Sequence, residues 1–401
     1  MKEEQKALEP RLRFPEFRDA GGWEAQRIGK YLTESRIKGS KGDVAKKLTV
    51  KLWGNGVYEK NEAVQGSANT QYYRRKAGQF IYSKLDFLNQ AFGIIPEHLD
   101  NCESTVDLPC FDASTQLDVR FLLEYVQRKE FYKRHGEVAD GGRKAKRIQV
   151  GTFLGFPIFL PIPEEQQKIA DCLSSLDALI AAHIKKLEAL TTHKKGLMQQ
   201  LFPREGETVP RLRFPEFRDA GEWVVKPLKN LVENLDSKRV PITEADRAKG
   251  TIPYYGASGV IDFVDSYIFD EDLLCISEDG ANLVARTSPI AFSITGKTWV
   301  NNHAHVLKFR HKFTQTIVEN YLNAINLEDF LTGMAQPKLN RAKLDTIPIF
   351  LPGEGEQQKV ADCLSSLDTL ITAHTKKLET LKTHKKGLMQ QLFPNPEAVG
   401  A

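Results

Sequence analysis

Basic and aromatic side chains gathered in two stretches of the first half of the sequence are well suited to bind a polyanion. Tyr72–Lys76 combines two tyrosines with three cations, and a second basic stretch runs from Arg128 to Arg147. Lys and Arg neutralise phosphate groups, and Arg also forms paired hydrogen bonds with base edges. These stretches predict contact with nucleic acid through Tyr72, Tyr73, Arg74, Arg75, Lys76, Arg134, His135, Arg143, Lys144 and Lys146.

A second set of polar residues occupies the other half of the chain. Amides, hydroxyls and guanidinium groups in loops are the groups that read bases or hold phosphates. Two simpler explanations stay open: a solvated charged surface, and, for Asn301–His303, a turn whose side chains bond the local backbone. The candidates are Tyr254, Tyr255, Ser258, Asn282, Arg286, Asn301, Asn302, His303, Gln336, Lys338, Asn340 and Arg341.

Motifs of common enzymes are absent from the sequence. It contains no GxxxxGK[ST], HExxH or GxSxG pattern and no glycine-rich dinucleotide fingerprint. Without a Pro-Pro dipeptide, it also lacks the [DNS]PP[YFW] tetrapeptide of amino-methyltransferases. We therefore expect no catalytic and no metal-binding residues.

The bulk properties restrict the class of protein. The 401 residues suffice for two or three domains, and a net charge of +4 is compatible with nucleic acid without being diagnostic. The five cysteines form no CxxC pair, which favours a reducing cytoplasm. We expect no membrane span, because no apolar run reaches about 18 residues.

The candidate residues are distributed around a segment that occurs twice. Residues 157–203 and 348–394 differ at only nine positions, and a shorter duplicate, RLRFPEFRDAG, stands at 11–21 and 211–221. The chain therefore alternates variable and constant segments. Its last residues resemble the start of the linker that follows Pro203, which suggests a cyclic arrangement with neighbouring termini.

Apolar residues follow a heptad pattern in both copies of the long repeat. Steps of three and four over about five heptads predict a coiled coil, and flanking prolines delimit helices of about 37 residues. Two such helices in one chain are natural antiparallel partners. Histidines and lysines in the seam would fix its register, and a metal or catalytic role for the histidines is the weaker alternative. The predicted seam contains Leu173, Leu176, Ile180, His183, Leu187, Leu190, Leu364, Leu367, Ile371, His374, Leu378 and Leu381, with Lys194 and Lys385 further along.

Each variable segment is expected to run from strands to one helix and then to a polar loop. In the first, the predicted strands are 50–53, 80–82 and 92–95 and the helix is 116–133; the second has its helix at 314–331. The predicted fold is α+β, with two strand-rich domains and two long helices. The blocks are domain 1 (1–156), helix 1 (157–203), domain 2 (204–347), helix 2 (348–394) and a tail (395–401).

Taken together, these motifs resemble the specificity subunits of Type I restriction–modification systems. The resemblance rests on the doubled plan, on EQQKIADCLSSLD and EQQKVADCLSSLD, on the FPEF motif and on the run from Tyr254 to Leu307. It implies a non-catalytic subunit in which each strand-rich domain reads one half of a split, asymmetric site in double-stranded DNA. It also implies that the helices set the gap and bind two methyltransferase subunits, that restriction subunits join the complex, and that AdoMet, ATP and magnesium belong to those partners.

Three other functions stay open at this point. A specificity subunit of a Type IIB-like system would share the DNA recognition. A coiled-coil scaffold without DNA would share the helices. A catalytic nuclease or methyltransferase is opposed by the missing motifs.

Overall fold

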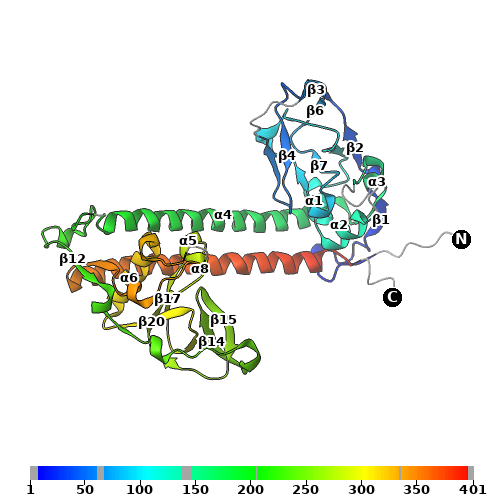
Figure 1. The fold of residues 1–401 in the computed structure, drawn as a ribbon. Helices are drawn as coiled ribbons and strands as arrows, with labels where there is room; N and C mark the ends of the chain where they lie inside the picture. Colours follow the sequence, from blue (N-terminus) through cyan, green and yellow to red (C-terminus); the bar gives the residue numbers. More distant parts are fainter. Residues whose placement is uncertain (1–7, 61–66, 138–146, 205, 334–335, 396–401) are drawn as a thin grey trace. The chain divides into compact units, whose positions relative to one another are not determined.

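The computed structural model describes residues 8–60, 67–137, 147–204, 206–333 and 336–395, which form two compact units (Figure 1). Unit 1 joins Met1–Ala182 to Leu378–Ala401, and unit 2 is His183–Lys377. Each unit combines one variable segment with the first part of one long helix and the last part of the other. The predicted blocks are therefore sequence blocks and not compact units, because the two parts of each helix belong to different hydrophobic cores.

Unit 1 is built around a four-stranded sheet in the order β2-β10-β7-β8, with a three-stranded sheet β3-β6-β9 and the hairpin β4-β5 beside it. Its core is aromatic and joins this sheet to α1 and α3. The helices are α1 (Val119–Val126), α2 (Lys129–Gly136) and α3 (Val150–Gly155). The strands are β1 (Glu24–Arg27), β2 (Leu32–Ser35), β3 (Lys38–Lys41), β4 (Leu48–Val50), β5 (Val57–Glu59), β6 (Gln71–Arg74), β7 (Phe80–Tyr82), β8 (Phe92–Ile94), β9 (Glu103–Ser104), β10 (Cys110–Ala113) and β11 (Pro157–Leu160).

Unit 2 repeats the same central sheet as β13-β20-β17-β18 and adds a four-stranded sheet β15-β14-β19-β16. In each unit, an antiparallel pair ties the start of the variable segment to the start of the repeat: β1 with β11, and β12 with β21. The helices are α5 (Asn282–Ala285), α6 (Lys312–Ala324) and α7 (Arg341–Leu344). The strands are β12 (Val224–Pro227), β13 (Val232–Asn234), β14 (Lys249–Gly256), β15 (Gly259–Val264), β16 (Phe269–Asp270), β17 (Leu273–Ser277), β18 (Ala291–Ile294), β19 (Lys297–Val300), β20 (Ala304–Phe309) and β21 (Pro348–Leu351).

The two long helices are α4 (Pro163–Leu201) and α8 (Glu354–Leu392), each of 39 residues. The predicted coiled coil and internal repeat are confirmed: the parts of α4 and α8 that share a unit run antiparallel, and their heptad residues are buried or half-buried. In unit 2, Lys194 pairs with Asp368 at 2.5 Å. In unit 1, the repeat equivalents Lys385 and Asp177 pair at 2.7 Å. The same register contact is therefore made in both units.

The seam histidines contact each other in unit 2. The Nδ1 atoms of His183 and His374 lie 3.0 Å apart, and the ring centroids lie 5.1 Å apart. One ring must donate and the other accept, so this contact favours one alignment of the helices, as a polar seam pair does in other coiled coils. Across the described residues, no group of three or more His, Cys, Asp or Glu side chains could hold a metal ion.

The two short duplicates, RLRFPEF and EQQK, are partners in the fold. Arg13 forms two hydrogen bonds to Glu165, at 2.9 and 2.7 Å, and Lys168 pairs with Glu16 at 2.9 Å. In unit 2, Arg213 and Glu356 form the equivalent paired contact at 2.8 and 2.6 Å. Each leading segment is thereby fixed to the start of the long helix in its own unit.

The chain's start also contacts the end of the last helix. The backbone N–H of Leu12 donates to the carbonyl of Gln391, as that of Leu212 does to Gln200. Both leucines are exposed, whereas Trp23 and Trp223 are buried and anchor the segments by apolar contact. The equivalent contacts agree with the predicted cyclic plan.

Three local predictions differ from the structure. The predicted strand 50–53 is a strand end followed by a turn, because β4 stops at Val50 and Trp53 has a φ of 60°. The predicted helix 116–133 is two helices, since Arg128 is extended and its guanidinium donates to the Pro394 carbonyl at 3.0 Å. The predicted helix 314–331 ends at Ala324, where Ile325 turns extended.

None of the helices in the described parts of the chain is long and apolar enough to cross a membrane.

Candidate nucleic-acid interface

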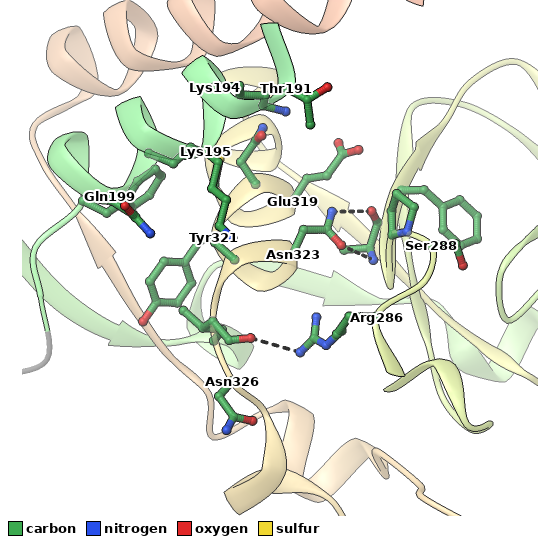
Figure 2. Close-up of a pocket in the computed structure, with 18 of the residues that line it drawn as sticks. Thr191, Lys194, Lys195, Gln199, Arg286, Ser288, Glu319, Tyr321, Asn323 and Asn326 are labelled. Carbon is green, nitrogen blue, oxygen red and sulfur yellow. Dashed lines mark hydrogen bonds between the residues drawn. The ribbon is translucent and has the colours of Figure 1, made fainter. Parts of the chain in front are cut away.

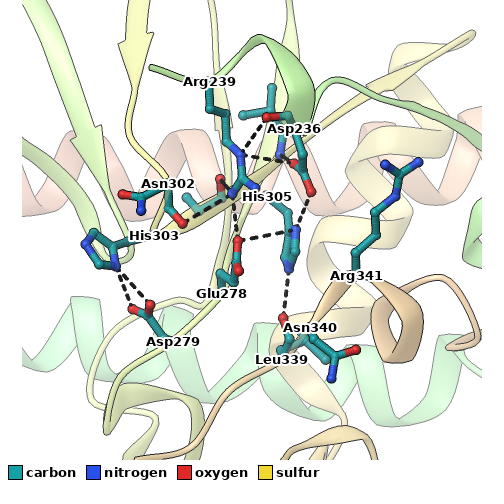
Figure 3. A network of polar contacts seen from close by, with 12 residues as sticks. Asp236, Arg239, Glu278, Asp279, Asn302, His303, His305, Leu339, Asn340 and Arg341 are labelled. Atoms are coloured by element: carbon teal, nitrogen blue, oxygen red, sulfur yellow. Dashed lines mark hydrogen bonds and ion pairs between the residues drawn. The ribbon is translucent and has the colours of Figure 1, made fainter. Parts of the chain in front are cut away.

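A polar network in unit 2 joins four loops that are far apart in the sequence (Figure 3). Arg239 donates to Glu278 Oε2 at 2.7 Å and to the Ala304 carbonyl at 2.8 Å. Lys338 pairs with Glu278 at 3.2 Å, and the Leu339 N–H donates to the Glu278 carbonyl at 2.8 Å. The network therefore fixes the backbone of the loops that carry several of the predicted contact residues.

The centre of this network is the buried side chain of His305. Its Nδ1 lies 2.6 Å from Asp236 Oδ2, and its Nε2 lies 2.7 Å from the Leu339 carbonyl oxygen. Burial opposes ionisation of Asp236, but hydrogen bonds from His305 and the Val306 N–H outweigh it and lower the pKa of Asp236 below its usual value. Because a carbonyl oxygen only accepts, Nε2 donates to Leu339, and Nδ1 faces the Asp236 carboxylate.

The predicted residues of unit 2 differ in solvent exposure: some are exposed, some are half-buried and others are buried. Ser258, Asn302, His303, Gln336, Lys338 and Arg341 are exposed. His303 lies against Asp279 at 2.9 Å, and Figure 3 places it with Asn302 at the edge of the network. Tyr255, Asn282, Arg286 and Asn340 are half-buried, and Asn340 caps α7 by accepting from the Lys343 N–H at 3.0 Å.

Three predictions in unit 2 are corrected by burial or by position. Tyr254 is buried, and its hydroxyl bonds the backbone of Ile242. Asn301 is also buried, and its Oδ1 accepts from the His303 N–H, which matches the turn alternative. Arg286 donates to the carbonyls of Leu283, Leu322 and Ile325, so its guanidinium is held inside the fold.

Arg286 lines a different feature, a cleft of about 1190 Å³ between α6, the last part of α4 and segment 283–292 (Figure 2). Unit 1 has a cleft of about 1160 Å³ with the same helix residues from its own end of α8. The shared lining consists of repeat equivalents: Lys194 and Lys385, Lys195 and Lys386, Met198 and Met389, Gln199 and Gln390, and Phe202 and Phe393.

In unit 1, Tyr72, Tyr73 and Arg74 lie on β6, and Arg75 and Lys76 follow its last residue. Arg74 and Lys76 are exposed, and the rings of Tyr72 and Tyr73 are half-buried. Arg75 is a correction: it is buried, and its guanidinium donates to Ser104 Oγ at 2.8 Å and to the Ser35 carbonyl at 2.7 Å. Arg75 directly follows the last residue of β6 and turns inward, so the three consecutive cations do not all face solvent.

The second basic stretch of unit 1 is only partly described. Arg134 is exposed, whereas His135 stacks on Phe156 with centroids 4.4 Å apart. Burial, together with the charge of Arg134, lowers the pKa of His135 to about 4, so it is a neutral packing residue at pH 7. Arg143, Lys144 and Lys146 lie outside the described residues.

Sequence reasoning missed the supporting residues Asp236, Arg239, Glu278 and His305. The only signal was His305 at an inward position of an apolar strand, which is unusual for a histidine without a partner. Its partners are distant in the sequence, at separations of 69 and 34 residues.

Comparisons with known proteins agree on one family. The model of the Type I restriction modification DNA specificity domain matches residues 55–192 and 220–383. A proposed type I restriction enzyme specificity subunit of Haemophilus influenzae is 35% identical over 149 residues, which are 37% of this chain and 38% of that protein. The MjaVIII specificity subunit of Methanocaldococcus jannaschii is 25% identical over 421 residues, covering 95% of this chain and 93% of its own.

A similar fold is found among solved structures. The crystal structure of a Type-I restriction-modification system S subunit from M. genitalium superimposes with a TM-score of 0.66 at 15% identity. The match covers 96% of this chain and 99% of that one. This likeness supports the predicted α+β plan with two strand-rich domains and long helices.

Proposed function

The chain belongs to the Type I restriction modification DNA specificity family, and from that premise we propose that each of its two units reads one half of a split site in double-stranded DNA. The observation that carries the proposal is the pair of units itself. Both have the same central sheet order and nearly identical long helices, yet the exposed polar residues of their loops differ. An asymmetric two-part site requires two units that share a scaffold and differ in the residues that contact the bases.

The residues proposed to contact DNA are chosen from the exposed and half-buried candidates. In unit 2, Asn302, His303 and Arg341 lie around the polar network (Figure 3), and Lys338 pairs with Glu278. Exposed Gln336 precedes Lys338 by two residues, so the set combines amides with cations. In unit 1, Tyr72, Tyr73, Arg74 and Lys76 supply rings and cations. Amide and guanidinium groups suit base edges, and lysines suit phosphates. Tyr255, Ser258 and Arg134 are proposed with them.

We propose that the catalytic reactions are carried out by partner subunits. Two copies of a methyltransferase subunit are proposed to bind the chain, and restriction subunits to join that complex, with AdoMet, ATP and magnesium held by those partners. The two near-equivalent clefts support this stoichiometry, because two copies of one partner need two equivalent surfaces.

The long helices are proposed to set the gap between the two half-sites. Inserting one heptad at equivalent positions of α4 and α8 should add about 10 Å, at 1.5 Å per residue. This length corresponds to roughly three base pairs of duplex DNA. Methylation mapping in cells that express the longer chain should show the same half-sites with a wider gap. An unchanged gap would show that the helices do not act as a spacer.

A chain ending at Pro203 provides the direct test of modular reading. Unit 1 needs the last part of α8, and the near-identical last part of α4 in a second copy can supply it. We expect residues 1–203 to form a dimer with two copies of unit 1 and, with the methyltransferase subunit, to methylate a palindromic site. Light scattering and methylation mapping measure the two results. A half-chain that stays monomeric with its partner present, or that methylates an asymmetric site, would contradict the proposal.

A further inference from the structure

In both units, the backbone carbonyl at one equivalent position accepts a hydrogen bond from a buried side chain, but the donor residue differs. The repeats are offset by 191 residues, since Pro157 corresponds to Pro348, and this offset makes Ile148 the equivalent of Leu339. The hydroxyl of Tyr82 donates to the Ile148 carbonyl at 3.0 Å, and His305 Nε2 donates to the Leu339 carbonyl at 2.7 Å. The two N–H groups also match, with Ile148 donating to Lys84 and Leu339 to Glu278.

The two donors come from different strands of the central sheet. Tyr82 lies on β7, whereas His305 lies on β20, which is the equivalent of β10. Both side chains are almost fully buried, at 0% and 1% exposure. Each unit therefore binds the equivalent carbonyl with a buried donor, and the donor comes from a different strand in each unit. This recurrence indicates that the position of this backbone must be fixed.

Ile148 and Leu339, whose carbonyls are bound, stand next to exposed basic residues in the sequence. Lys338 stands directly before Leu339 and Arg341 follows two residues later, and both are exposed. In unit 1, exposed Arg147 stands directly before Ile148 and lies 4.0 Å from Asp107. Leu339 itself is buried, so its main chain connects the core to the side chains at the surface.

Charged residues from three loops surround the side chain of His305. Asp236 binds Nδ1, and Glu278 lies 3.8 Å from the same nitrogen and is itself paired with Arg239 and Lys338. Tyr82 needs no such partners, because a phenol donates in its neutral form. Burial raises the pKa of Tyr82 far above its usual value, so the hydroxyl keeps its proton.

We propose that Tyr82 and His305 are positioning residues. Tyr82 holds the backbone at Ile148 and His305 holds it at Leu339, each in the conformation in which the neighbouring exposed residues contact DNA. The inference rests on the proposed function, and it adds that each residue serves only the half-site of its own unit. A buried donor that fixes a loop backbone reduces the freedom of side chains that must meet base edges within hydrogen-bond distance.

The test uses the complex of the full chain with its methyltransferase subunit and a random-sequence duplex library. Selected sequences give the base preference at each half-site for the native chain and for the variants Tyr82→Phe and His305→Leu. Tyr82→Phe should lower the preference at one half-site about three- to tenfold, the effect of losing one hydrogen bond, and leave the other unchanged. His305→Leu should do the same at the other half-site, and His305→Gln, which keeps an amide donor, should recover part of it.

A matched control separates positioning from stability. Tyr125 is a second buried tyrosine of unit 1, and its hydroxyl accepts from the Phe159 N–H at 3.1 Å, on strand β11. Tyr125→Phe should lower the melting temperature by a similar amount without changing either base preference. If His305→Leu does not fold, Tyr82→Phe still decides the question.

The outcomes are distinguishable. A native complex that selects no sequence would overturn the proposed function. A selective native complex whose preferences are unchanged by Tyr82→Phe, or fall equally at both half-sites, would overturn only the positioning role.

Discussion

Replacing Arg13 by alanine should lower the free energy of unfolding of unit 1 by about 3–5 kcal/mol, because the change leaves a buried carboxylate without its cation. The side chains of Arg13 and Glu165 are 9% and 1% exposed and form two parallel hydrogen bonds. The bonds to Glu165 also raise the pKa of Arg13. Urea unfolding followed by the fluorescence of buried Trp23 measures the loss, and Arg213→Ala should act likewise on unit 2 through Glu356.

Two further variants make the Arg13 result specific. Arg18 belongs to the same duplicated segment but is exposed, so Arg18→Ala should change stability by no more than about 0.5 kcal/mol. Exchanging both partners, Arg13→Met with Glu165→Met, should restore most of the loss, since two apolar side chains can replace a buried ion pair. An Arg13→Ala loss below about 1 kcal/mol would mean that the pair is solvated and does not hold the leading segment.

The second large effect is expected at Lys385. Its ammonium group lies 2.9 Å from Glu124 Oε1 and 2.7 Å from Asp177 Oδ2. Glu124 is buried, and its Oε2 is without a hydrogen-bond partner. Lys385→Met should therefore destabilise unit 1 by about 2–3 kcal/mol at pH 7, somewhat less than a fully buried pair because Asp177 is half exposed.

The pH dependence of this variant identifies the cause. Burial raises the pKa of Glu124, and Lys385 is the main group that opposes the rise. A carboxyl whose folded pKa lies above its unfolded value takes up a proton more readily in the folded state, so it lowers stability progressively as the pH rises above the unfolded pKa, until the folded pKa is passed. Without Lys385 the pKa should rise further. The deficit of Lys385→Met should therefore shrink as the pH falls from 7 to about 5, opposite to the usual acid destabilisation.

The repeat supplies the control for Lys385. Lys194 is its equivalent in α4, but its partner Asp368 is 45% exposed. Among the described residues, no buried carboxylate is hydrogen-bonded to the Lys194 ammonium group as Glu124 is to that of Lys385. Lys194→Met should lose only about 0.5–1 kcal/mol and show little recovery at lower pH. Equal losses for both lysines, or a Lys385→Met deficit that grows at low pH, would contradict the role given to Glu124.

The long helices and their pairing could be predicted because heptads report directly on burial. Ile169, Leu173 and Leu190 are buried as their spacing requires, and the prolines stand where the helices begin and end. Lys194 and Lys385 were expected to fix the register of the seam. Their pairing with Asp368 and Asp177 depends on the antiparallel register, which spacing within one helix does not reveal.

The candidate site was less accessible from the sequence. Charge and aromatic content singled out the stretch from Tyr72 to Lys76, but they could not separate Arg74, which is exposed, from Arg75, which is buried one residue later. Arg75 follows the last residue of β6, and its guanidinium bonds Ser104 and the Ser35 carbonyl, which only the folded chain brings to it. Similarly, the role of His305 depends on Asp236 and Leu339, which only the folded chain brings to its ring.

The doubled plan explains why constant and variable residues are separated so sharply. The constant residues make the contacts that both units need: Arg13 with Glu165, Arg213 with Glu356, and the lysines with the aspartates of the seam. The variable residues form the sheets and the exposed loops. A chain built in this way can change what one unit binds without altering its helices or its other unit.

The most direct test is to express the chain with its methyltransferase subunit and to map methylated bases across the genome of the host. Our account predicts one split, asymmetric motif with a gap of fixed length, whose two halves respond separately to substitutions in unit 1 and unit 2. A continuous motif, or a motif in which substitutions in one unit alter both halves, would contradict the claim that each unit reads one half-site.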